Sequence, residues 1–534
     1  MGALNSYSDA LLRLPVISNM KSDPPQSTPL STMSHVVDMM MSEDIGAVVI
    51  VEDSRPVGII TEKDILRRVV KTGRDFEEVL AKDVMTKPLL TIEAERPISD
   101  ALEMLRENNI RRLVITEEGA LVGLTTERRL LEIVNEQYRM NSLGRRIRVL
   151  SDESDRLKVA YISTYPPREC GIATYTNDLV DAISRLYVTQ SPTIIAINDW
   201  GGYYNYPPHV GFQIDRDEVD SYVKAAEYIN RSDIDIVNLQ HEYGLFGGIW
   251  GEYILDFLER VEKPVVTTLH TVLPEPVPDA YRVLEGVLRF SEHVTVMARV
   301  GIEIIEQVYH TYGDKAQYIP HGCPNVPFIT SVPVKKSLGL EDRVVLSTFG
   351  LISRGKGIEY AIRALPRIVK TEPRVLYLVI GETHPEVRKH EGESYRQSLL
   401  DLVRDLGIYG NVRFVNSFLE KSELIRYLQA TDIYILPYPN RDQISSGTLL
   451  YALSTGKAIV STPFLHAEEV ISEGAAMRCE LRDPESIADA VINLLHFSDV
   501  HDKIERRAYQ YSREMIWPNV GMRYLNLFYK TLGL

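Results

Sequence analysis

The sequence predicts an α/β protein in which a duplicated strand–helix module precedes two doubly wound parallel sheets. A stretch of about 30 residues near the start recurs without a gap at an offset of 65 residues, which indicates a tandem repeat. From residue 157 onward, short β-branched runs alternate with helical stretches, a pattern typical of parallel sheets covered by helices on both faces. These runs are too numerous for one sheet, so we expect two.

The composition is that of an ordinary globular chain with several domains. Its 534 residues are 44% hydrophobic and 25% charged, and no apolar run approaches the roughly 18 residues that would span a bilayer. The start of the chain lacks the pattern of a secretory signal, so we expect a cytoplasmic protein. Cys170, Cys323 and Cys479 lie far apart, which indicates neither a disulfide framework nor a cysteine zinc site. The net charge of −15 argues against a nucleic-acid partner.

Each copy of the repeat has the pattern of a helix, two strands joined by a polar turn, and a second helix. The first of these strands are Val48 to Val51 and Leu113 to Thr116, and neither copy could bury its apolar strands alone. "GIITEKD" at residues 58–64 and "GLTTERR" at residues 123–129 occupy the same place in the two copies. With these motifs, residues 1–145 resemble a CBS-domain pair.

That resemblance implies an adenine nucleotide (AMP, ADP or ATP) between the copies, with Thr61 and Asp64 holding its ribose. In the second copy Thr126 is kept but Arg129 replaces the acid, and a guanidinium cannot accept hydrogen bonds from ribose hydroxyls. At most one good nucleotide site is therefore expected. Alternatively, Thr61 and Asp64 only cap the helix that follows them. We also expect a homodimer formed through this pair.

A polar linker at residues 146–156 separates the pair from two Rossmann-like halves. We assign residues 157–330 to the first half and residues 331–510 to the second. The carboxyl ends of the strands in both halves can face one shared cleft, which is where ligands of such sheets bind. The sequence therefore predicts a ligand site between the halves.

Several motifs stand at the ends of predicted strands in this part of the chain: "ECGIATYT", "LQHEYG", "TLHT", "IPHG", "GLISRGKG", "VIGE" and "DQISSGTLLYALSTG". In this order they resemble a family 4 retaining glycosyltransferase of GT-B fold, over about residues 156–534. The resemblance implies an acceptor-binding first half, a second half that binds a nucleotide-sugar donor, and helices at residues 511–534 that cross back to the first half. Gly171 opens a helix whose free N–H groups a phosphate can approach.

The motif "GLISRGKG" begins at Gly350 and supplies two cations. A diphosphate that leaves without a metal needs cations and N–H donors from the protein. Lys356 matches the lysine of the resembled family, whereas Leu351 stands where an arginine is usual, so we expect Arg354 to substitute for it. Cations oppose a helix dipole at a helix start unless an anion offsets them, which favours a site over solvent-exposed charges.

No metal is expected at the donor site. The D-x-D sequences at Asp215/Asp217 and Asp233/Asp235 could suggest a metal-held diphosphate. We interpret them instead as solvated or strand-end acids.

The donor loop departs from the resembled family at two positions. Gln443 and Tyr451 stand where acidic residues are usual. Ser446, Gly447 and Thr448 precede a helical run and can offer N–H and hydroxyl donors to an anion. Gln443 can still hydrogen-bond sugar hydroxyls, and Tyr451 offers one hydroxyl where a carboxylate would accept two. We interpret this as a variant donor site, although a helix cap with a core tyrosine also fits.

Three histidines stand at predicted strand ends that converge on the cleft. His270 matches the family histidine beside the reacting carbon, and His241 with Glu242 is expected on the acceptor side. His321 lies in the motif "IPHG". A lone histidine is more often structural, but three at one edge favour a site.

The leading hypothesis is a metal-independent retaining hexosyltransferase that needs no cofactor beyond its nucleotide-sugar donor. It would act on an unknown hydroxyl acceptor and respond to adenine nucleotide at the first module. One alternative is a catalytically silent nucleotide-sugar sensor, in which the loss of the two acids would be what abolishes catalysis. Another is a different GT-B enzyme such as a nucleotide-sugar epimerase, which would need acids in the cleft.

Overall fold

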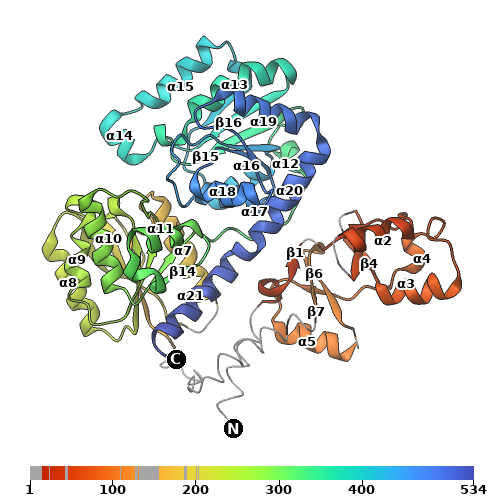
Figure 1. The fold of residues 1–534 in the computed structure, drawn as a ribbon, viewed down its shortest axis with the longest axis horizontal. Helices are drawn as coiled ribbons and strands as arrows, with labels where there is room; N and C mark the ends of the chain where they lie inside the picture. Colours follow the sequence, from red (N-terminus) through yellow and green to blue (C-terminus); the bar gives the residue numbers. More distant parts are fainter. Residues whose placement is uncertain are drawn as a thin grey trace, which may run out of the picture. The chain divides into compact units, whose positions relative to one another are not determined.

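The computed structural model describes residues 15–126, Leu130 and residues 156–534, apart from positions 23, 43–45, 54, 109, 186–188, 200 and 203. The chain divides into two compact units, Met1–Asp155 and Arg156–Leu534. Figure 1 shows the elements of each unit. Arg129 and most of the predicted linker lie outside the described residues.

The first unit contains two copies of one strand arrangement. In the first copy β3 (Ala47–Glu52) pairs in parallel with β2 (Gln26–Ser27) and antiparallel with β4 (Arg55–Thr61). In the second copy β6 (Arg112–Glu117) pairs in parallel with β5 (Thr91–Glu93) and antiparallel with β7 (Ala120–Thr126). Short strand β1 (Lys21–Ser22) adds to β7.

The two antiparallel pairs obey the sequence repeat residue by residue. Ala47 lies opposite Thr61, and Arg112 lies opposite Thr126, so the register repeats at the same offset of 65 residues as the sequence. Helices of the unit are α2 (Met33–Ser42), α3 (Glu62–Arg68), α4 (Ala81–Val84) and α5 (Ile98–Glu107). The duplicated module predicted from the sequence is thus confirmed.

The first half of the second unit is a seven-stranded parallel sheet in the order β10-β9-β8-β11-β12-β13-β14. Its strands are β8 (Val159–Ser163), β9 (Thr193–Asn198), β10 (Val210–Asp215), β11 (Ile236–His241), β12 (Val265–Leu269), β13 (His293–Val296) and β14 (Ala316–Tyr318). Its helices are α7 (Gly171–Ser184), α8 (Val219–Arg231), α9 (Ile254–Leu258), α10 (Pro278–Phe290) and α11 (Val300–Val308). The central strands are buried along their whole length, as their β-branched sequence predicts.

The second half is a six-stranded parallel sheet in the order β17-β16-β15-β18-β19-β20. Its strands are β15 (Val344–Phe349), β16 (Val375–Ile380), β17 (Val412–Val415), β18 (Ile433–Leu436), β19 (Ala458–Ser461) and β20 (Met477–Arg478). Its helices are α12 (Ser331–Ser337), α13 (Ile358–Thr371), α14 (Pro385–Glu391), α15 (Ser394–Asp405), α16 (Lys421–Gln429), α17 (Gly447–Ser454), α18 (Leu465–Ser472), α19 (Pro484–His496) and α20 (Ser498–Ser512). Both predicted parallel sheets are therefore present.

Helix α21 (Trp517–Thr531) leaves the second half and packs against α7 of the first half (Figure 1). It does so with an apolar face that shares one core with the strands of the first sheet. At the crossing, Cys323 N–H donates to the Met515 carbonyl at 2.8 Å and Trp517 N–H donates to the Cys323 carbonyl at 3.1 Å. Two chain segments thus connect the halves side by side.

A buried hydroxyl network anchors α21. The Tyr524 hydroxyl lies 2.9 Å from the Tyr175 hydroxyl on α7, 2.9 Å from Thr268 Oγ1 on β12 and 3.0 Å from Thr295 Oγ1 on β13. Buried polar groups of this kind stabilise a structure only when each finds a partner. The network therefore specifies how α21 sits on the first sheet.

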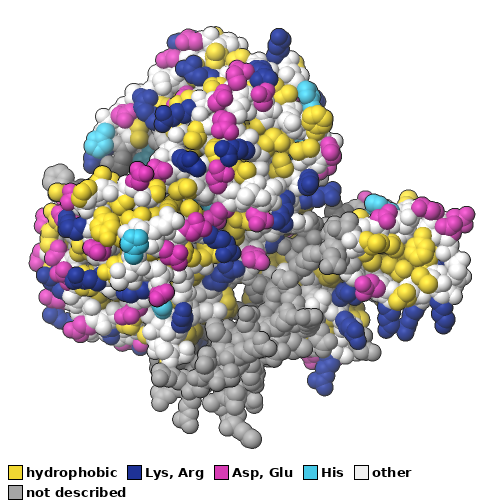
Figure 2. Space-filling model, viewed as in Figure 1, with side chains coloured by type: hydrophobic (Ala, Val, Ile, Leu, Met, Phe, Trp, Pro, Cys, Tyr) yellow, Lys and Arg dark blue, Asp and Glu magenta, His cyan; other side chains and the backbone are white. Residues whose placement is uncertain are grey.

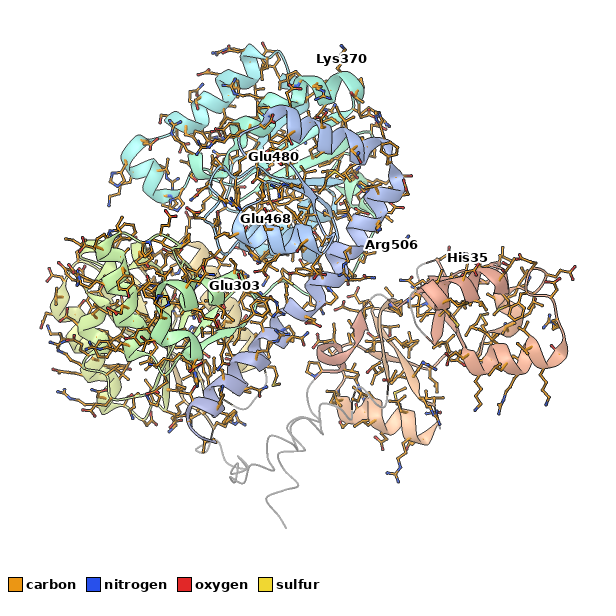
Figure 3. All side chains as sticks on the ribbon, viewed as in Figure 1. His35, Glu303, Lys370, Glu468, Glu480 and Arg506 are labelled. Atoms are coloured by element: carbon orange, nitrogen blue, oxygen red, sulfur yellow. The ribbon has the colours of Figure 1, made fainter. Side chains whose placement is uncertain are left out.

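The surface formed by the described residues carries mixed charge. On the visible face of the second unit, basic and acidic side chains are interspersed (Figure 2). Arg478 illustrates this, since it lies 3.0 Å from Glu468 and 3.1 Å from Glu480, both labelled in Figure 3. Among the described helices, none combines the length and the apolar composition needed to cross a bilayer.

We expect Tyr524→Phe to lower the free energy of unfolding of the second unit by about 1 to 3 kcal/mol, because it leaves buried hydroxyls of Tyr175, Thr268 and Thr295 without this partner. Thermal and urea unfolding of the full chain measures the change. Tyr409→Phe is the matched control, because Tyr409 is 65% exposed. Equal stability of the two variants would show that the network does not anchor α21.

Candidate active site

Each sheet of the second unit reverses its strand order at one place. β8 has its successor β9 on one side and β11 on the other, and β15 is likewise flanked by β16 and β18. Ligands of doubly wound sheets bind outside the carboxyl ends of the strands at such a switch point. His241 ends β11, and Gly350 follows β15, so predicted site residues stand at both switch points.

The start of α17 is ordered by Ser446, its N-cap residue. The Ser446 hydroxyl accepts from Leu449 N–H at 3.3 Å and lies 3.1 Å from the Thr448 hydroxyl. The Ser446 N–H donates to Nδ1 of His466 at 3.1 Å. Ser446 thus uses its own polar groups to shape the helix start, the part of a helix that attracts anions.

Lys356 points at this helix start. Its ammonium donates to the Tyr438 hydroxyl at 2.8 Å, and that hydroxyl lies 2.7 Å from Thr448 Oγ1. Burial alone would raise the pKa of the Tyr438 phenol, but the Lys356 ammonium and the Thr448 and Ser446 hydroxyls outweigh it and lower the pKa. A cation, a phenol and two hydroxyls are therefore gathered at one helix N-terminus. Nothing in the sequence singled out Tyr438 beyond its place after a strand.

Close backbone approaches explain the glycines around Lys356. A Cβ on Gly381 would lie 2.1 Å from the Gly350 carbonyl oxygen, and one on Gly357 would lie 2.1 Å from the Pro437 carbonyl oxygen. A Cβ on Gly350 would lie at an ordinary 3.4 Å from Lys356 Cε, but its φ of 132° favours glycine there. The loop after β15 is thereby held tightly against its neighbours.

Arg354 is not brought together with Lys356. Its guanidinium lies 3.7 Å from Glu391 Oε2 and stacks over the Tyr395 ring at 5.2 Å. The Arg354 side chain is 66% exposed. Its substitution for the missing arginine at Leu351 remains a prediction.

Two histidines of the first half meet the donor loop of the second. The Ser445 hydroxyl donates to the His270 carbonyl at 3.0 Å, and a Cβ on Gly447 would lie 3.1 Å from Nε2 of His321. His270 Nε2 is paired with Gln240 Oε1 at 2.8 Å. His270 and His321 therefore border the start of α17, as the sequence predicts for residues of a shared cleft.

Four buried histidines of the second unit are held neutral. Burial lowers the pKa of His241, His270 and His466 to about 3 and that of His321 to about 4. For His270, the neighbouring His321 and His241 add to the effect of burial. Neutral imidazoles can donate from one nitrogen and accept at the other, but they offer no positive charge to a phosphate.

His241 and Glu242 have different surroundings. The His241 ring is buried between the rings of Tyr243 and Phe246, and neither of its nitrogens has a hydrogen-bond partner among the described residues. The Glu242 carboxylate accepts from Thr271 Oγ1 at 2.6 Å and from Tyr243 N–H at 3.0 Å. Burial raises the pKa of Glu242 above its ordinary value. Glu242 is thus a buried acid at the carboxyl edge of the first sheet.

Neither side chain that replaces a family acid points freely into the cleft. The Gln443 amide donates to the Ser445 carbonyl at 2.9 Å, which ties it to its own loop. Tyr451 is 8% exposed and packs its ring against Phe349 at 5.8 Å. Burial raises the pKa of Tyr451, and the nearby Asp178 carboxylate raises it further.

Asp178 on α7 is a buried acid that the sequence did not single out. Its Oδ1 accepts from the Lys421 ammonium of α16 at 2.9 Å, so the ion pair joins the two halves. Burial raises the pKa of Asp178, while Lys421 opposes this shift. The only available signal was helical spacing, because Asp178 follows Gly171 and Tyr175 on one face of α7.

Gly171 opens α7 with free space in front of it. No heavy atom lies within 4 Å of a Cβ placed on Gly171, and the preceding Cys170 makes no side-chain cap. A side chain at Gly171 would thus meet no neighbour, and the approach of a phosphate to the first N–H groups of α7 remains a prediction.

In the first unit, Thr61 and Asp64 form a capping box at the start of α3. Asp64 Oδ2 accepts from Thr61 N–H at 3.0 Å and from the Thr61 hydroxyl at 2.6 Å, and Oδ1 accepts from Thr86 Oγ1 at 3.0 Å. The structural alternative considered for these residues is thus present. A ribose at this place would share the carboxylate with these donors.

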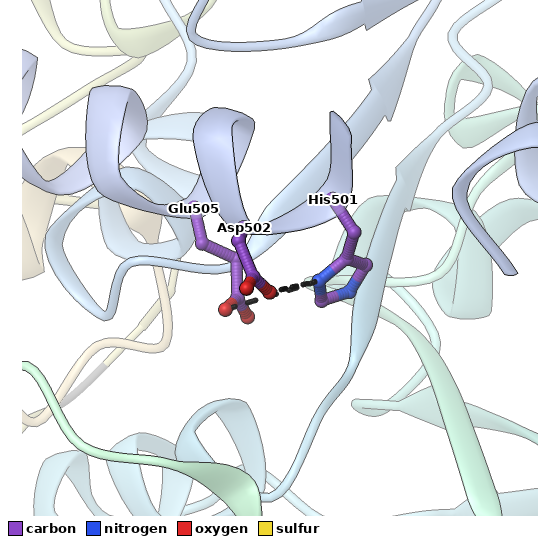
Figure 4. Close-up of side chains that lie close together, drawn as sticks. All are labelled: His501, Asp502 and Glu505. Atoms are coloured by element: carbon purple, nitrogen blue, oxygen red, sulfur yellow. Dashed lines mark ion pairs between the residues drawn. The ribbon is translucent and has the colours of Figure 1, made fainter. Parts of the chain in front are cut away.

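One group of potential metal ligands occurs among the described residues, on α20 (Figure 4). His501 Nδ1 lies 3.7 Å from Asp502 Oδ1 and 3.9 Å from Glu505 Oε2. Burial raises the pKa of Glu505, and the nearby Lys457 ammonium opposes the shift. The group lies away from the strand ends where Lys356 and the cleft histidines gather, and a lysine already competes for its acid.

Comparisons with known families identify two parts of the chain. Residues 343–496 match the family described as glycosyl transferases group 1. Residues 15–71 and 81–136 match the CBS domain.

Among curated relatives, an uncharacterized protein of Methanopyrus kandleri is 32% identical over 128 residues, which cover 24% of this chain and 64% of that protein. The phosphatidyl-myo-inositol mannosyltransferase of Mycolicibacterium smegmatis is 22% identical over 280 residues, covering 52% of this chain and 67% of that protein. The chain thus aligns with about two thirds of the length of each.

Solved structures similar to this chain share the fold of its second unit. A protein of Anabaena solved in complex with UDP has a TM-score of 0.57 at 14% identity, covering 70% of this chain and 100% of its own. The sucrose-phosphate synthase of Thermosynechococcus elongatus has a TM-score of 0.58 at 15% identity, covering 71% and 100%. The chain therefore contains a domain of the group 1 glycosyl transferases at residues 343–496 and a pair of CBS domains in its first unit, and its second unit has the GT-B fold of these solved structures.

Proposed function

We propose that the chain is a retaining hexosyltransferase of family 4 that moves a sugar from a nucleotide-sugar donor to a hydroxyl acceptor without a metal. The observation that carries this proposal is the contact chain from Lys356 through Tyr438 to Thr448 at the start of α17. It faces His270 and His321 of the first half across the donor loop.

The leaving diphosphate is the group that this contact chain suits. Negative charge grows on the diphosphate as the glycosidic bond breaks, and a preorganised cation with hydroxyl donors stabilises it. Lys356 supplies the cation, Thr448 a hydroxyl, and α17 the positive end of its dipole. The similar Anabaena protein was solved with UDP, which makes UDP and UDP-sugars the first ligands to test.

The first half supplies neutral groups around the reacting sugar. His270 is paired with Gln240 and stays uncharged, so it can hydrogen-bond a sugar hydroxyl but cannot neutralise phosphate. With retention, the acceptor hydroxyl attacks on the face that the leaving phosphate occupies, and that phosphate takes up the proton. Glu242, on the acceptor side, is positioned by Thr271 to accept from an acceptor hydroxyl.

A catalytically silent nucleotide-sugar sensor is the second candidate. It is favoured by two observations: the Gln443 amide is bonded to its own loop, and the Tyr451 hydroxyl faces Asp178. Such a protein would bind the nucleotide sugar without cleaving it. Hydrolysis or transfer of a radiolabelled nucleotide sugar by the full chain separates the two functions.

We further propose that an adenine nucleotide at the CBS pair regulates the transferase and that the pair forms a homodimer. The match of both copies to the CBS domain supports this. The cytoplasmic location expected from the sequence remains a prediction.

We expect Lys356→Ala to lower kcat/KM with the nucleotide sugar by a hundredfold or more, since loss of one preorganised electrostatic donor costs about 2.7 to 4 kcal/mol. Steady-state kinetics measure this. Arg354→Ala should lose less, because Glu391 and Tyr395 already hold its guanidinium. Normal turnover of Lys356→Ala would show that this loop does not bind the leaving diphosphate.

The buried histidines make stability depend on pH. In the unfolded chain they bind protons near pH 6.5, whereas the folded forms do so only near pH 3 to 4. The contribution of these neutral histidines to the free energy of unfolding is therefore fully present above pH 6.5. It is lost as the pH falls from 6.5 towards 3 to 4, by up to about 1.4 kcal/mol per pH unit for each histidine. Urea unfolding at pH 7, 6, 5 and 4.5 measures the slope.

Two variants test whether a buried histidine causes this dependence of the free energy of unfolding on pH. His241→Gln should reduce the slope by the contribution of one histidine. His496→Gln should leave the slope unchanged, because His496 is exposed on α19. An unchanged slope in His241→Gln would show that His241 is protonated in the folded protein.

We expect calorimetry of the full chain to detect AMP, ADP or ATP at the CBS pair, and Asp64→Asn to weaken it because an amide accepts fewer hydroxyl hydrogen bonds than a carboxylate. The exposed Glu78→Gln is the control. Bound nucleotide should shift the apparent affinity for donor by about five- to 150-fold, the usual range of coupling. Equal nucleotide affinity in Asp64→Asn and wild type would place the nucleotide away from Asp64.

A further inference from the structure

Three side chains of helix α20 converge on one point (Figure 4). His501 Nδ1 lies 3.7 Å from Asp502 Oδ1 and 3.9 Å from Glu505 Oε2. Glu505 follows His501 by four residues and Asp502 by three, and residues at these spacings are neighbours on a helix surface. One imidazole nitrogen and two carboxylate oxygens, all within 4.8 Å of one another, therefore surround a common point.

A hydrogen bond outside this group fixes the proton of the His501 ring. Its Nε2 lies 3.2 Å from the backbone carbonyl oxygen of Asp432, the residue directly before β18. A carbonyl oxygen can only accept, so Nε2 carries the proton, and the neutral imidazole turns the lone pair of Nδ1 towards the two carboxylates. Histidines that bind a metal almost always hold their second nitrogen in this way.

The two carboxylates have accepting capacity left for a cation. The Glu505 side chain is 19% exposed, and no hydrogen-bond donor among the described residues contacts its carboxylate. The Asp502 side chain is 60% exposed, which opens the group to solvent on that side. A lone pair and two negative charges that face one another repel, so a cation between them stabilises all three.

Lys457 is a cation that opposes a metal at this place. Its ammonium donates to the Gln429 carbonyl at 3.2 Å and acts on Glu505 through charge alone. It therefore lowers the affinity of the group for a second cation, but it supplies no hydrogen bond to the three ligand atoms.

The ligand set suits a divalent transition-metal ion. Zinc accepts imidazole together with carboxylates, whereas magnesium and calcium prefer oxygen ligands alone. Zinc binds nitrogen and oxygen at about 2.0 to 2.2 Å, so ligand atoms around a tetrahedral ion lie about 3.3 to 3.6 Å apart. The observed separations of 3.7 and 3.9 Å are slightly wider than this. Small rotations of the side chains close the difference.

We propose that His501, Asp502 and Glu505 bind one zinc ion, with water completing its coordination. The ion fastens the start of α20 to the amino-terminal edge of the second sheet, because the His501 ring is bonded to the residue before β18. Lys356 follows the carboxyl end of β15, at the opposite edge of that sheet, so the zinc ion takes no part in the transfer step. The inference is independent of the proposed function.

The competing role of the group is a plain ion pair. If Nδ1 of His501 also carries a proton, the imidazolium pairs with both carboxylates and the group binds no metal. Loss of His501 would then lower stability equally with and without zinc. A zinc site differs, because its contribution to stability depends on the zinc concentration.

Calorimetry and thermal unfolding of the full chain test the site, with zinc chloride added to protein that a chelator has stripped of metal. For wild type, we expect a zinc ion to bind and the unfolding temperature to rise as zinc exceeds its dissociation constant. His501→Gln and Asp502→Asn should each weaken this binding by about tenfold to a hundredfold or more, since loss of a group behind a ligand already costs that much.

His496→Gln is the matched control, because His496 is exposed on the neighbouring helix α19, and it should leave zinc binding unchanged. Asp502→Asn keeps the test valid if His501→Gln fails to fold, since the Asp502 side chain is largely exposed. Equal zinc affinity in wild type and Asp502→Asn would overturn the proposal. Wild-type protein that binds no zinc would overturn it as well and leave an ion pair.

Discussion

The docking of helix α21 on the first half is the constraint on which the second unit depends. The Tyr524 hydroxyl joins α7, β12 and β13 in one buried network, so the last helix of the chain is fixed to the first sheet. At the crossing, a Cβ on Gly322 would lie 2.2 Å from the Trp517 ring, which leaves no space for any other residue. Because α21 directly follows the second half in the chain, these contacts tie the second half to the first sheet.

The chemistry of the cleft follows from burial between those halves. Burial lowers the pKa values of His270 and His321, so both imidazoles stay neutral and can only donate or accept hydrogen bonds. Positive charge instead comes from Lys356, which is supported by Tyr438 at the start of α17. Each half thus contributes a different property: the first offers neutral and acidic groups, and the second offers a cation with a helix dipole.

Much of the fold was predictable because it depends on local patterns. The repeat offset of 65 residues reappears in the strand register, and β-branched runs became buried parallel strands. The strand-end motifs also located Lys356, His270 and the start of α17, since strands of a parallel sheet carry their ligands at the same edge. The partners of Arg354, Gln443 and Tyr451 were not predictable, because each is selected by a side chain distant in sequence or by the local path of a loop.

The sequence by itself determined the duplicated module, the two parallel sheets and the residue types at the strand ends, since these depend on hydrophobic periodicity and on motifs within a few neighbouring residues. Only the tertiary structure decided which groups meet. Asp178 and Lys421 are separated by 243 positions, yet their side chains lie 2.9 Å apart. The physical reason is that packing between halves places side chains by the geometry of whole helices and sheets, and no local pattern along the chain encodes that distance.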